Sequence, residues 1–449
     1  MLKRTIGLLP IGWALRQSLE KGYTWQDFRA DFGAALVVSL IALPLSMALA
    51  IAVGLAPEHG IYTAIVAGIA AALLGGSLFQ ISGPTAAFVV ILIPIVTQLG
   101  LRGIIWCQIL AGFILIMLGF AKIGQLIHRV PYAVTTGFTT GIAIVLATLS
   151  LKDFLGINMV NTSTHYADKV ANLFENLPHT QWPTAIVGTL TMLAMVNAKR
   201  LPKFIPAPIL GILIGALVAW FLNHFGYTVA TIGSEFSYRS HDGNMHMGVP
   251  PFAPSLHLPT LLPNDLFTIP SLAELKILIF PALIIATLVA LESLLSAAIA
   301  DSLTQTKHQP NAELKGIGVA NILCGLASGI PATAAIARTA ANIHSGAKSP
   351  IACILHSLLI LLYVLLFTPL ICYIPMTTLA AILLITAYRM SHLEHFIKII
   401  RHDVFENRTI LLSCCLTTVF IDMVAGIGLG MALAGIFYIR NRMKNLFRI

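Results

Sequence analysis

Fourteen apolar stretches, separated by mostly short polar segments, constrain the fold of this 449-residue chain more than any other feature. Only 10% of its residues are charged, whereas a soluble domain has about 25%. A bilayer offers no partner to backbone polar groups, so apolar stretches cross it as helices. We therefore predict an all-α polytopic membrane protein with 14 transmembrane segments, arranged as two sets of seven.

The two sets are separated by a longer polar loop. The first set comprises Phe32–Val53, Ile61–Leu74, Pro84–Leu99, Ile104–Ala121, Pro131–Leu149, Pro183–Asn197 and Ala207–Phe225. The second set comprises Leu278–Ala300, Leu314–Ala327, Thr333–His344, Ile351–Leu370, Met376–Tyr388, Thr409–Met423 and Ile427–Ile439. Several segments, among them the third and the tenth, are shorter than the roughly 20 residues that a full crossing needs.

The pattern divides the chain into five parts. We expect a basic cytoplasmic segment with a surface helix at 1–30, a first repeat at 31–226, an extracytoplasmic loop at 227–276, a second repeat at 277–440 and a short cytoplasmic tail at 441–449. With both termini in the cytoplasm, most of the 27 Lys and Arg residues fall on the cytoplasmic side, as the positive-inside rule requires. The net charge of +9 therefore indicates membrane orientation rather than a nucleic-acid partner.

A short motif occurs at equivalent places in the two sets. Gly83-Pro84-Thr85-Ala86-Ala87 begins the third segment, and Pro331-Ala332-Thr333-Ala334-Ala335 begins the tenth. Because seven segments is an odd number, the second repeat must be inverted in the membrane. Paired short segments interrupted by Gly and Pro point to the substrate site of a transporter. The alternative is that these small residues only permit close helix packing.

Arg338 lies in the first turns of the tenth segment, inside an apolar region. Burying such a charge at membrane depth costs at least about 2.5–3.5 kcal/mol. A half-helix with a bare N-terminus and a nearby Arg has the properties of an anion site. The alternative is an Arg that pairs with a carboxylate only to hold two helices together.

Glu292 is the carboxylate in the middle of the eighth segment, and Arg338 is its candidate partner. Ser296, four residues on, shares a helix face with Glu292. Intramembrane acids are usually functional, so this face is a candidate for binding a proton or a cation. A permanent ion pair with Arg338 remains the alternative.

Motifs for other chemistries are missing from the sequence. It contains no P-loop, no GxGxxG after a strand and no HExxH, so an ATP-driven pump and an intramembrane metalloprotease have no support. We expect a transporter without a cofactor, not an enzyme.

Four stretches resemble the SulP family of anion transporters, the bacterial relatives of solute carrier family 26. They are Ala42–Ala48, Gly54–Ala64, Ile81–Phe88 and Ala334–Asn342. Three further stretches, Glu292–Leu295, Thr306–His308 and Asn311–Leu314, are most similar to the family's C4-dicarboxylate branch, which takes up succinate, fumarate and aspartate.

The resemblance implies a 7 + 7 inverted repeat divided between a core domain (segments one to four and eight to eleven) and a gate domain (the others). It also implies which residues form the site. The substrate would contact Leu45, Leu49, Thr85, Ala86, Ala335, Ile336, Ala337 and Arg338, and the coupling ion would use Glu292 and Ser296. The sodium-coupled bicarbonate members carry the shorter aspartate in place of Glu292, which favours H⁺ here, with Na⁺ as the alternative.

The chain departs from the family pattern in having no room for a STAS domain after the last segment, so the domain is expected to be absent or on another chain. We expect a secondary active transporter of the bacterial inner membrane that takes up C4-dicarboxylates with H⁺ by alternating access. The alternative within the family is a sulfate or bicarbonate transporter, and the alternative of a different class is an uncoupled anion channel. Whether the protein is a monomer or a homodimer stays open.

Overall fold

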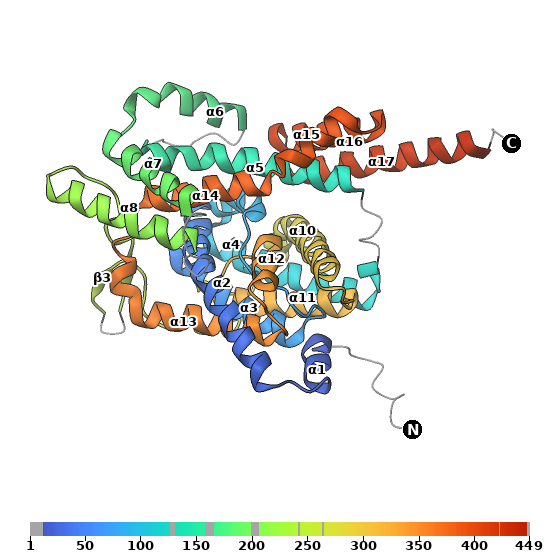
Figure 1. Cartoon of the computed structure of the whole chain (residues 1–449), viewed down its shortest axis with the longest axis horizontal. Helices are drawn as coiled ribbons and strands as arrows, with labels where there is room; N and C mark the ends of the chain where they lie inside the picture. The colour runs from blue at the N-terminus through green and yellow to red at the C-terminus, as the bar shows by residue number, and fades with distance from the viewer. Residues whose placement is uncertain are drawn as a thin grey trace.

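The computed structural model describes residues 12–125, 131–157, 166–198, 206–240, 243–262, 265–421 and 423–446. These residues are mostly helical, as predicted (Figure 1). The helices of the first half are α1 (Trp13–Glu20), α2 (Trp25–Ala52), α3 (Pro57–Leu74), α4 (Ala87–Phe120), α5 (Tyr132–Leu155), α6 (Tyr166–Glu175), η2 (Leu177–His179), α7 (Trp182–Asn197) and α8 (Ala207–His224). The second half contains α9 (Ile232–Glu235), α10 (Leu272–Thr304), α11 (Pro310–Leu326), α12 (Ile336–His344), α13 (Ile351–Ile371), α14 (Met376–Met390), α15 (Leu393–His402), α16 (Phe405–Phe420) and α17 (Met423–Leu446).

The first membrane helix begins earlier than predicted. A surface helix, α1, is present, but α2 already starts at Trp25, inside the segment predicted to end at residue 30. Thr24 and Asp27 form a capping box, in which the Thr24 side chain accepts from the Asp27 N–H and the Asp27 carboxylate accepts from the Thr24 N–H. This reciprocal bonding satisfies two N–H groups at the helix start, so the helix extends past the apolar stretch.

The third and fourth predicted segments meet without a connecting loop. Both belong to α4, and Gly100 between them has φ 62° and ψ −162°, so two helices join there at a kink. A positive φ is accessible to glycine without steric cost. The kink is therefore located where the sequence supplies that residue.

The predicted extracytoplasmic loop is more ordered than expected. It contains α9 and a hairpin of β2 (Ser237–Arg239) with β3 (Met245–Met247), and Val249 is fully buried. Its end was also predicted too late, because α10 begins at Leu272. Ser271 and Glu274 form the capping box that starts this helix.

Two short strands meet far from each other in sequence. β1 (Ser82–Gly83) pairs antiparallel with β4 (Thr333–Ala334), with Ser82 opposite Ala334 and Gly83 opposite Thr333. All four residues are buried. The pair holds the starts of α4 and α12 side by side, so the two motifs predicted to be equivalent are in contact.

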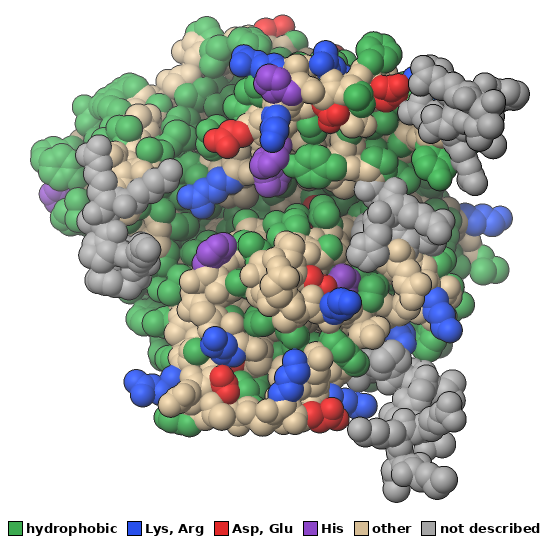
Figure 2. Space-filling model, turned by 45° about the vertical axis from the view of Figure 1, so that its right-hand side comes forward, with side chains coloured by type: hydrophobic (Ala, Val, Ile, Leu, Met, Phe, Trp, Pro, Cys, Tyr) green, Lys and Arg blue, Asp and Glu red, His purple; other side chains and the backbone are tan. Residues whose placement is uncertain are grey.

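Hydrophobic side chains cover much of the outer surface. On α8, Leu213, Leu217 and Trp220 are each more than 60% exposed, as expected for a helix that faces lipid. Among the described residues, seven helices are long and apolar enough to cross a membrane; the total of 14 segments stays a prediction. Figure 2 shows one face of the molecule, on which Lys and Arg side chains are scattered among hydrophobic side chains.

Candidate functional site

The chain just before α12 is extended backbone buried among helices. Such backbone is tolerated at membrane depth only when side chains satisfy its polar groups. The Thr63 hydroxyl accepts from the Ile330 N–H (2.7 Å) and is within 2.9 Å of the Ile330 carbonyl. The Asn321 amide accepts from the Ala332 N–H and donates to the Ala332 carbonyl, both at 2.9 Å. These side chains from α3 and α11 therefore fix the path of the segment.

Helix α10 supports the same segment with a residue next to Glu292. The Ser293 hydroxyl lies 2.8 Å from the Thr333 hydroxyl and accepts from the Ala334 N–H at 3.3 Å. The Gln108 amide of α4 donates to the Gly329 carbonyl at 2.9 Å. Sequence reasoning did not single out these supporting residues. Gln108 and Asn321 are single polar side chains within apolar stretches of their helices, which is a usable signal, whereas Ser293 adjoins Glu292 and gives no separate signal.

The strand pair is followed by two helix starts, those of α4 and α12. The N-cap residues are Ala86 for α4 and Ala335 for α12, and neither helix has a side-chain cap. The predicted starts at Pro84 and Thr333 were early, because Gly83 and Thr333 belong to the strand pair. The first N–H groups of a helix have no partner four residues earlier. In α4, those of Phe88 and Val89 donate to the carbonyls of Thr85 and Ala86, both at 3.2 Å, so the start of α12 is the better placed of the two to receive an anion.

Arg338 lies behind the strand pair rather than on an open surface. It is 3% exposed, and its Nη2 donates to the carbonyl of Pro84 at 2.6 Å. Its Nε and Nη1 atoms are buried and have no hydrogen-bond partner among the described residues. A Cβ at Gly83 would come within 2.9 Å of Nη1, so glycine at this position makes room for the guanidinium group.

Glu292 does not pair directly with its candidate partner Arg338, which contradicts the permanent ion pair that the sequence left as the alternative. Within the described part of the chain, no ion pair joins these two side chains. The carboxylate of Glu292 instead accepts a hydrogen bond of 3.0 Å from the Thr85 hydroxyl. The guanidinium is held by a backbone carbonyl, and its charge reaches Glu292 only through space.

Glu292 lines a cavity of about 250 Å³ between four helices. The other walls come from α5, α12 and α17 and are almost wholly apolar, with Ile336 at the start of α12 among them. A larger cavity of about 590 Å³ lies between α5, α7, α8 and α9. None of the predicted site residues lines this larger cavity. The smaller cavity, which has Glu292 and Ile336 on its walls, is therefore the candidate site.

Comparison with known proteins identifies the family of the chain. The model of the Sulfate permease family matches residues 28–413. The chain belongs to this family. Its relatives include a putative sulfate transporter of Bacillus subtilis, 37% identical over 96% of this chain and 77% of the relative. The bicarbonate transporter BicA of Picosynechococcus is 28% identical over 94% of this chain and 72% of the relative.

Solved structures of transporters have the same fold. The transmembrane domain of a cyanobacterial bicarbonate transporter BicA is 25% identical, with a TM-score of 0.75 over 90% of this chain and 98% of that one. Murine Slc26a9, an anion transporter solved in the inward-facing state, is 16% identical, with a TM-score of 0.79 over 97% of this chain and 72% of that one. This member of the Sulfate permease family is therefore a mostly helical polytopic membrane protein and an anion transporter.

The structure places Ser296 away from the cavity. It is fully buried, and its hydroxyl donates to Thr339 of α12 at 3.2 Å. Thr339 in turn accepts from the N–H of Ile81 at 3.1 Å. Ser296 thus ties α10 to α12, and among the described residues no group of His, Cys, Asp and Glu has the arrangement of a metal site.

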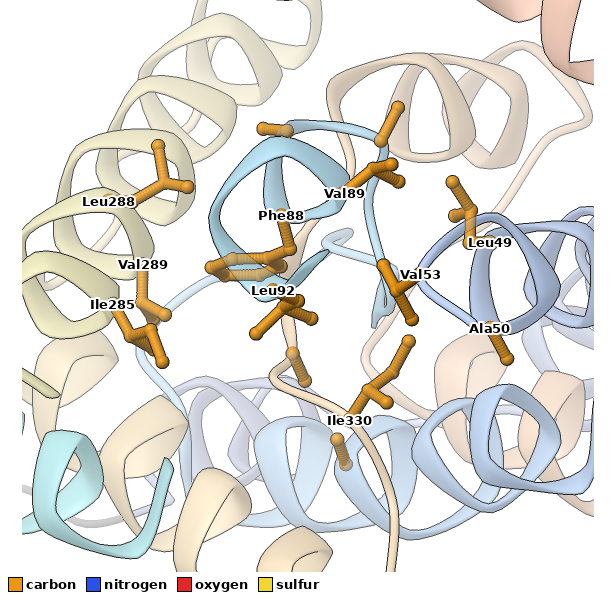
Figure 3. Close-up of a cluster of buried hydrophobic side chains, with 14 of the residues drawn as sticks. Leu49, Ala50, Val53, Phe88, Val89, Leu92, Ile285, Leu288, Val289 and Ile330 are labelled. Carbon is orange, nitrogen blue, oxygen red and sulfur yellow. The ribbon is translucent and has the colours of Figure 1, made fainter. Parts of the chain in front are cut away.

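The two leucines of the first membrane helix differ in position. Leu49 is 1% exposed and packs in the cluster around Phe88 and Val89 of α4 (Figure 3). Leu45 is partly buried against the same cluster. Leu49 therefore packs against the first turn of α4 and stabilises its position. Ala337, by contrast, is exposed at the start of α12.

Proposed function

We propose that this member of the Sulfate permease family carries a small inorganic oxyanion, sulfate first and bicarbonate as the alternative, by secondary active transport coupled to H⁺. The observation that carries the proposal is the buried guanidinium of Arg338, whose Nε and Nη1 atoms have no partner within the part of the chain that the structure describes. A buried charge without an ion-pair partner is costly, so a site that retains one favours an anionic ligand nearby.

The electrostatics of the helix starts add to this charge. The N-termini of α4 and α12 both lie at the strand pair, and neither has a side-chain cap. Each helix N-terminus carries about half a positive charge. With Arg338 behind them, the two termini create a positive potential that the Glu292 carboxylate only partly offsets.

The relatives favour the alternative substrate over the predicted one. Those reported above are described as sulfate or bicarbonate transporters, and none of them as a C4-dicarboxylate transporter. Sulfate and bicarbonate are therefore favoured over C4-dicarboxylates as the substrate.

Transport would proceed by alternating access between a core and a gate domain of a 14-segment inverted repeat, in a bacterial inner membrane with both termini in the cytoplasm. Two observations support this. The short strands at β1 and β4 precede helix starts in both halves, and the cavity lies between α10 and α12 on one side and α5 and α17 on the other. Relative movement of those pairs would open and close the cavity.

Glu292 would carry the coupling proton. It is the carboxylate on the cavity wall, and its bonded partner among the described residues is a hydroxyl rather than a cation. A carboxylate placed in this way can take up and release a proton, whereas one in a permanent ion pair cannot do so easily. An uncoupled channel would gain nothing from a negative charge beside an anion site.

The test is uptake into proteoliposomes that contain the purified protein. Labelled sulfate, bicarbonate and succinate are compared, each with an inward H⁺ gradient, an inward Na⁺ gradient or neither. We expect sulfate to accumulate with the H⁺ gradient alone. Accumulation of succinate alone would refute the proposed substrate, accumulation with Na⁺ alone would refute the coupling ion, and non-saturable flux without accumulation would support the channel.

A further inference from the structure

The Thr85 hydroxyl joins the carboxylate of Glu292 to the start of helix α4. Its Oγ1 lies 3.0 Å from Oε2 of Glu292. The backbone holds Thr85 at this place, because its carbonyl accepts from the N–H of Phe88 in the first turn of α4 at 3.2 Å. Thr85 is partly exposed and precedes the N-cap residue Ala86, so its hydroxyl lies at the start of α4, next to the strand pair that also leads into the uncapped start of α12.

The charged Glu292 carboxylate and a bound anion compete for the single hydrogen of the Thr85 hydroxyl. A threonine hydroxyl has one hydrogen to donate, and a carboxylate can only accept. While Glu292 is charged, the strong bond to its carboxylate occupies that hydrogen. The hydroxyl then presents only its oxygen lone pairs to an incoming anion, which is repulsive.

We propose that Thr85 is the positioning residue that links proton binding on Glu292 to anion binding. One proton is taken up by the carboxylate, which becomes a neutral carboxyl group. The Thr85 hydroxyl keeps its own proton and turns about its C–O bond, so that its hydrogen points to the anion. The carboxyl O–H can now donate to Thr85 Oγ1, so the contact survives with its direction reversed, and release of the proton reverses every step.

The surroundings of Glu292 contain little else that could link the two events. Arg338 of α12 is the charged group whose field reaches Glu292, and it keeps its charge at all relevant pH values. Among the described residues, the other side chains that line the cavity are not titratable: on α5 Val134, Thr135, Phe138 and Thr139, on α10 Thr287, Leu291 and Leu295, on α12 Ile336, and on α17 Ile427 and Met431.

This inference rests on the proposed function, and its test is equilibrium binding of labelled sulfate to the purified full chain. Affinities are measured at mildly acidic and at neutral pH for the wild type, Thr85→Val and Thr85→Ser. The matched control is Thr97→Val, because the Thr97 hydroxyl of the same helix bonds only to the carbonyls of Ile93 and Pro94.

We expect sulfate to bind the wild type more tightly at acidic pH. Thr85→Val should reduce the acid-to-neutral affinity ratio by roughly ten-fold, the effect of losing one hydrogen bond to a charged group. Thr85→Val should still bind sulfate somewhat more tightly at acidic pH, because protonation of Glu292 also removes the repulsion between its carboxylate and the anion. Thr85→Ser and Thr97→Val should keep the full ratio. An equal loss of affinity at both pH values would make Thr85 an ordinary ligand and overturn the proposal, as would no change.

Infrared difference spectroscopy separates this proposal from the proposed substrate. Subtraction of Glu292→Gln spectra isolates the carboxylate band of Glu292. Loss of the Thr85 bond should shift that band in Thr85→Val and leave it in place in Thr85→Ser, and an unshifted band in Thr85→Val overturns the inference. If the wild type binds no sulfate at either pH, the proposed substrate is wrong, and the band alone decides the role of Thr85.

Discussion

Arg338 of α12 donates a hydrogen bond of 2.6 Å to the carbonyl of Pro84, which precedes α4. This bond crosses from one repeated motif to the other. It orients the guanidinium so that Nη2 is used by the protein, while Nε and Nη1 have no partner among the described residues. The position of the charge therefore depends on the backbone of the first motif, and changes there should affect anion binding.

Gly83→Ala should weaken anion binding with little loss of stability. The added Cβ would lie 2.9 Å from Nη1 of Arg338, and the flexible end of the side chain can move while the backbone stays in place. Displacing one charged hydrogen-bond donor should lower sulfate affinity about ten-fold. Isothermal titration and thermal unfolding in detergent measure the two effects. Gly33→Ala is the control for affinity, because nothing lies within 4 Å of its Cβ. It should leave sulfate affinity unchanged and raise stability by about 0.5–1 kcal/mol, since Gly33 lies inside helix α2 and alanine is the better helix former.

Arg338→Ala should lower sulfate affinity by about 100-fold or more, because both the charge and its donors are lost. The protein should still fold, since a buried charge without an ion pair contributes little net stability. Arg338→Lys keeps the charge without the planar fork and should lose less affinity. Unchanged binding in a folded Arg338→Ala protein would remove Arg338 from the site.

The parts of the fold that follow from hydrophobic patterning were predictable from the sequence. The apolar stretches match helices in the structure, with shifts of a few residues where a cap decides the boundary, as at Thr24 and Ser271. The equivalence of the motifs at Thr85 and Thr333 also identified two parts of the chain that lie together in the structure. The helix starts at Thr24 and Ser271 differ from the predicted ones because hydropathy does not show which side chains bond to the first N–H groups of a helix.

Contacts between distant side chains could not be predicted in the same way. Opposite charges at membrane depth suggested an ion pair between Glu292 and Arg338, but each has a nearer neutral partner in the first motif. Ser296 shares a helix turn with Glu292, yet its hydroxyl is directed to Thr339. Which of several partners a polar group takes depends on the crossing of the two motifs, and single-sequence reasoning does not supply that geometry.

Glu292→Gln should abolish sulfate accumulation driven by an H⁺ gradient and leave sulfate exchange at equal pH. Glutamine cannot take up or release a proton, but its carbonyl oxygen can still accept from Thr85. Parallel assays of gradient-driven uptake and of counterflow in proteoliposomes distinguish these effects. The conservative variant Glu292→Asp should keep some coupling. Accumulation in Glu292→Gln that follows the H⁺ gradient as in the wild type would assign the proton to another group.

Asn321→Leu should destabilise the protein by releasing the extended segment before α12. The Asn321 amide bonds to both the N–H and the carbonyl of Ala332, each at 2.9 Å, and the whole contact is buried. Leucine would leave two backbone groups unsatisfied, at a cost of about 1–3 kcal/mol each. A fall in the unfolding temperature in detergent, measured beside the wild type, reports this cost.

The control for Asn321→Leu is Thr386→Val, because the Thr386 hydroxyl bonds only to the carbonyl of Ile382 one turn earlier in its own helix. That carbonyl can keep its backbone hydrogen bond, so the control should unfold near the wild-type temperature. Because Ala332 lies just before the strand pair, Asn321→Leu should also lower sulfate affinity, by releasing the segment that carries Arg338. Equal unfolding temperatures for the two variants would show that the path of the extended segment does not depend on the Asn321 amide.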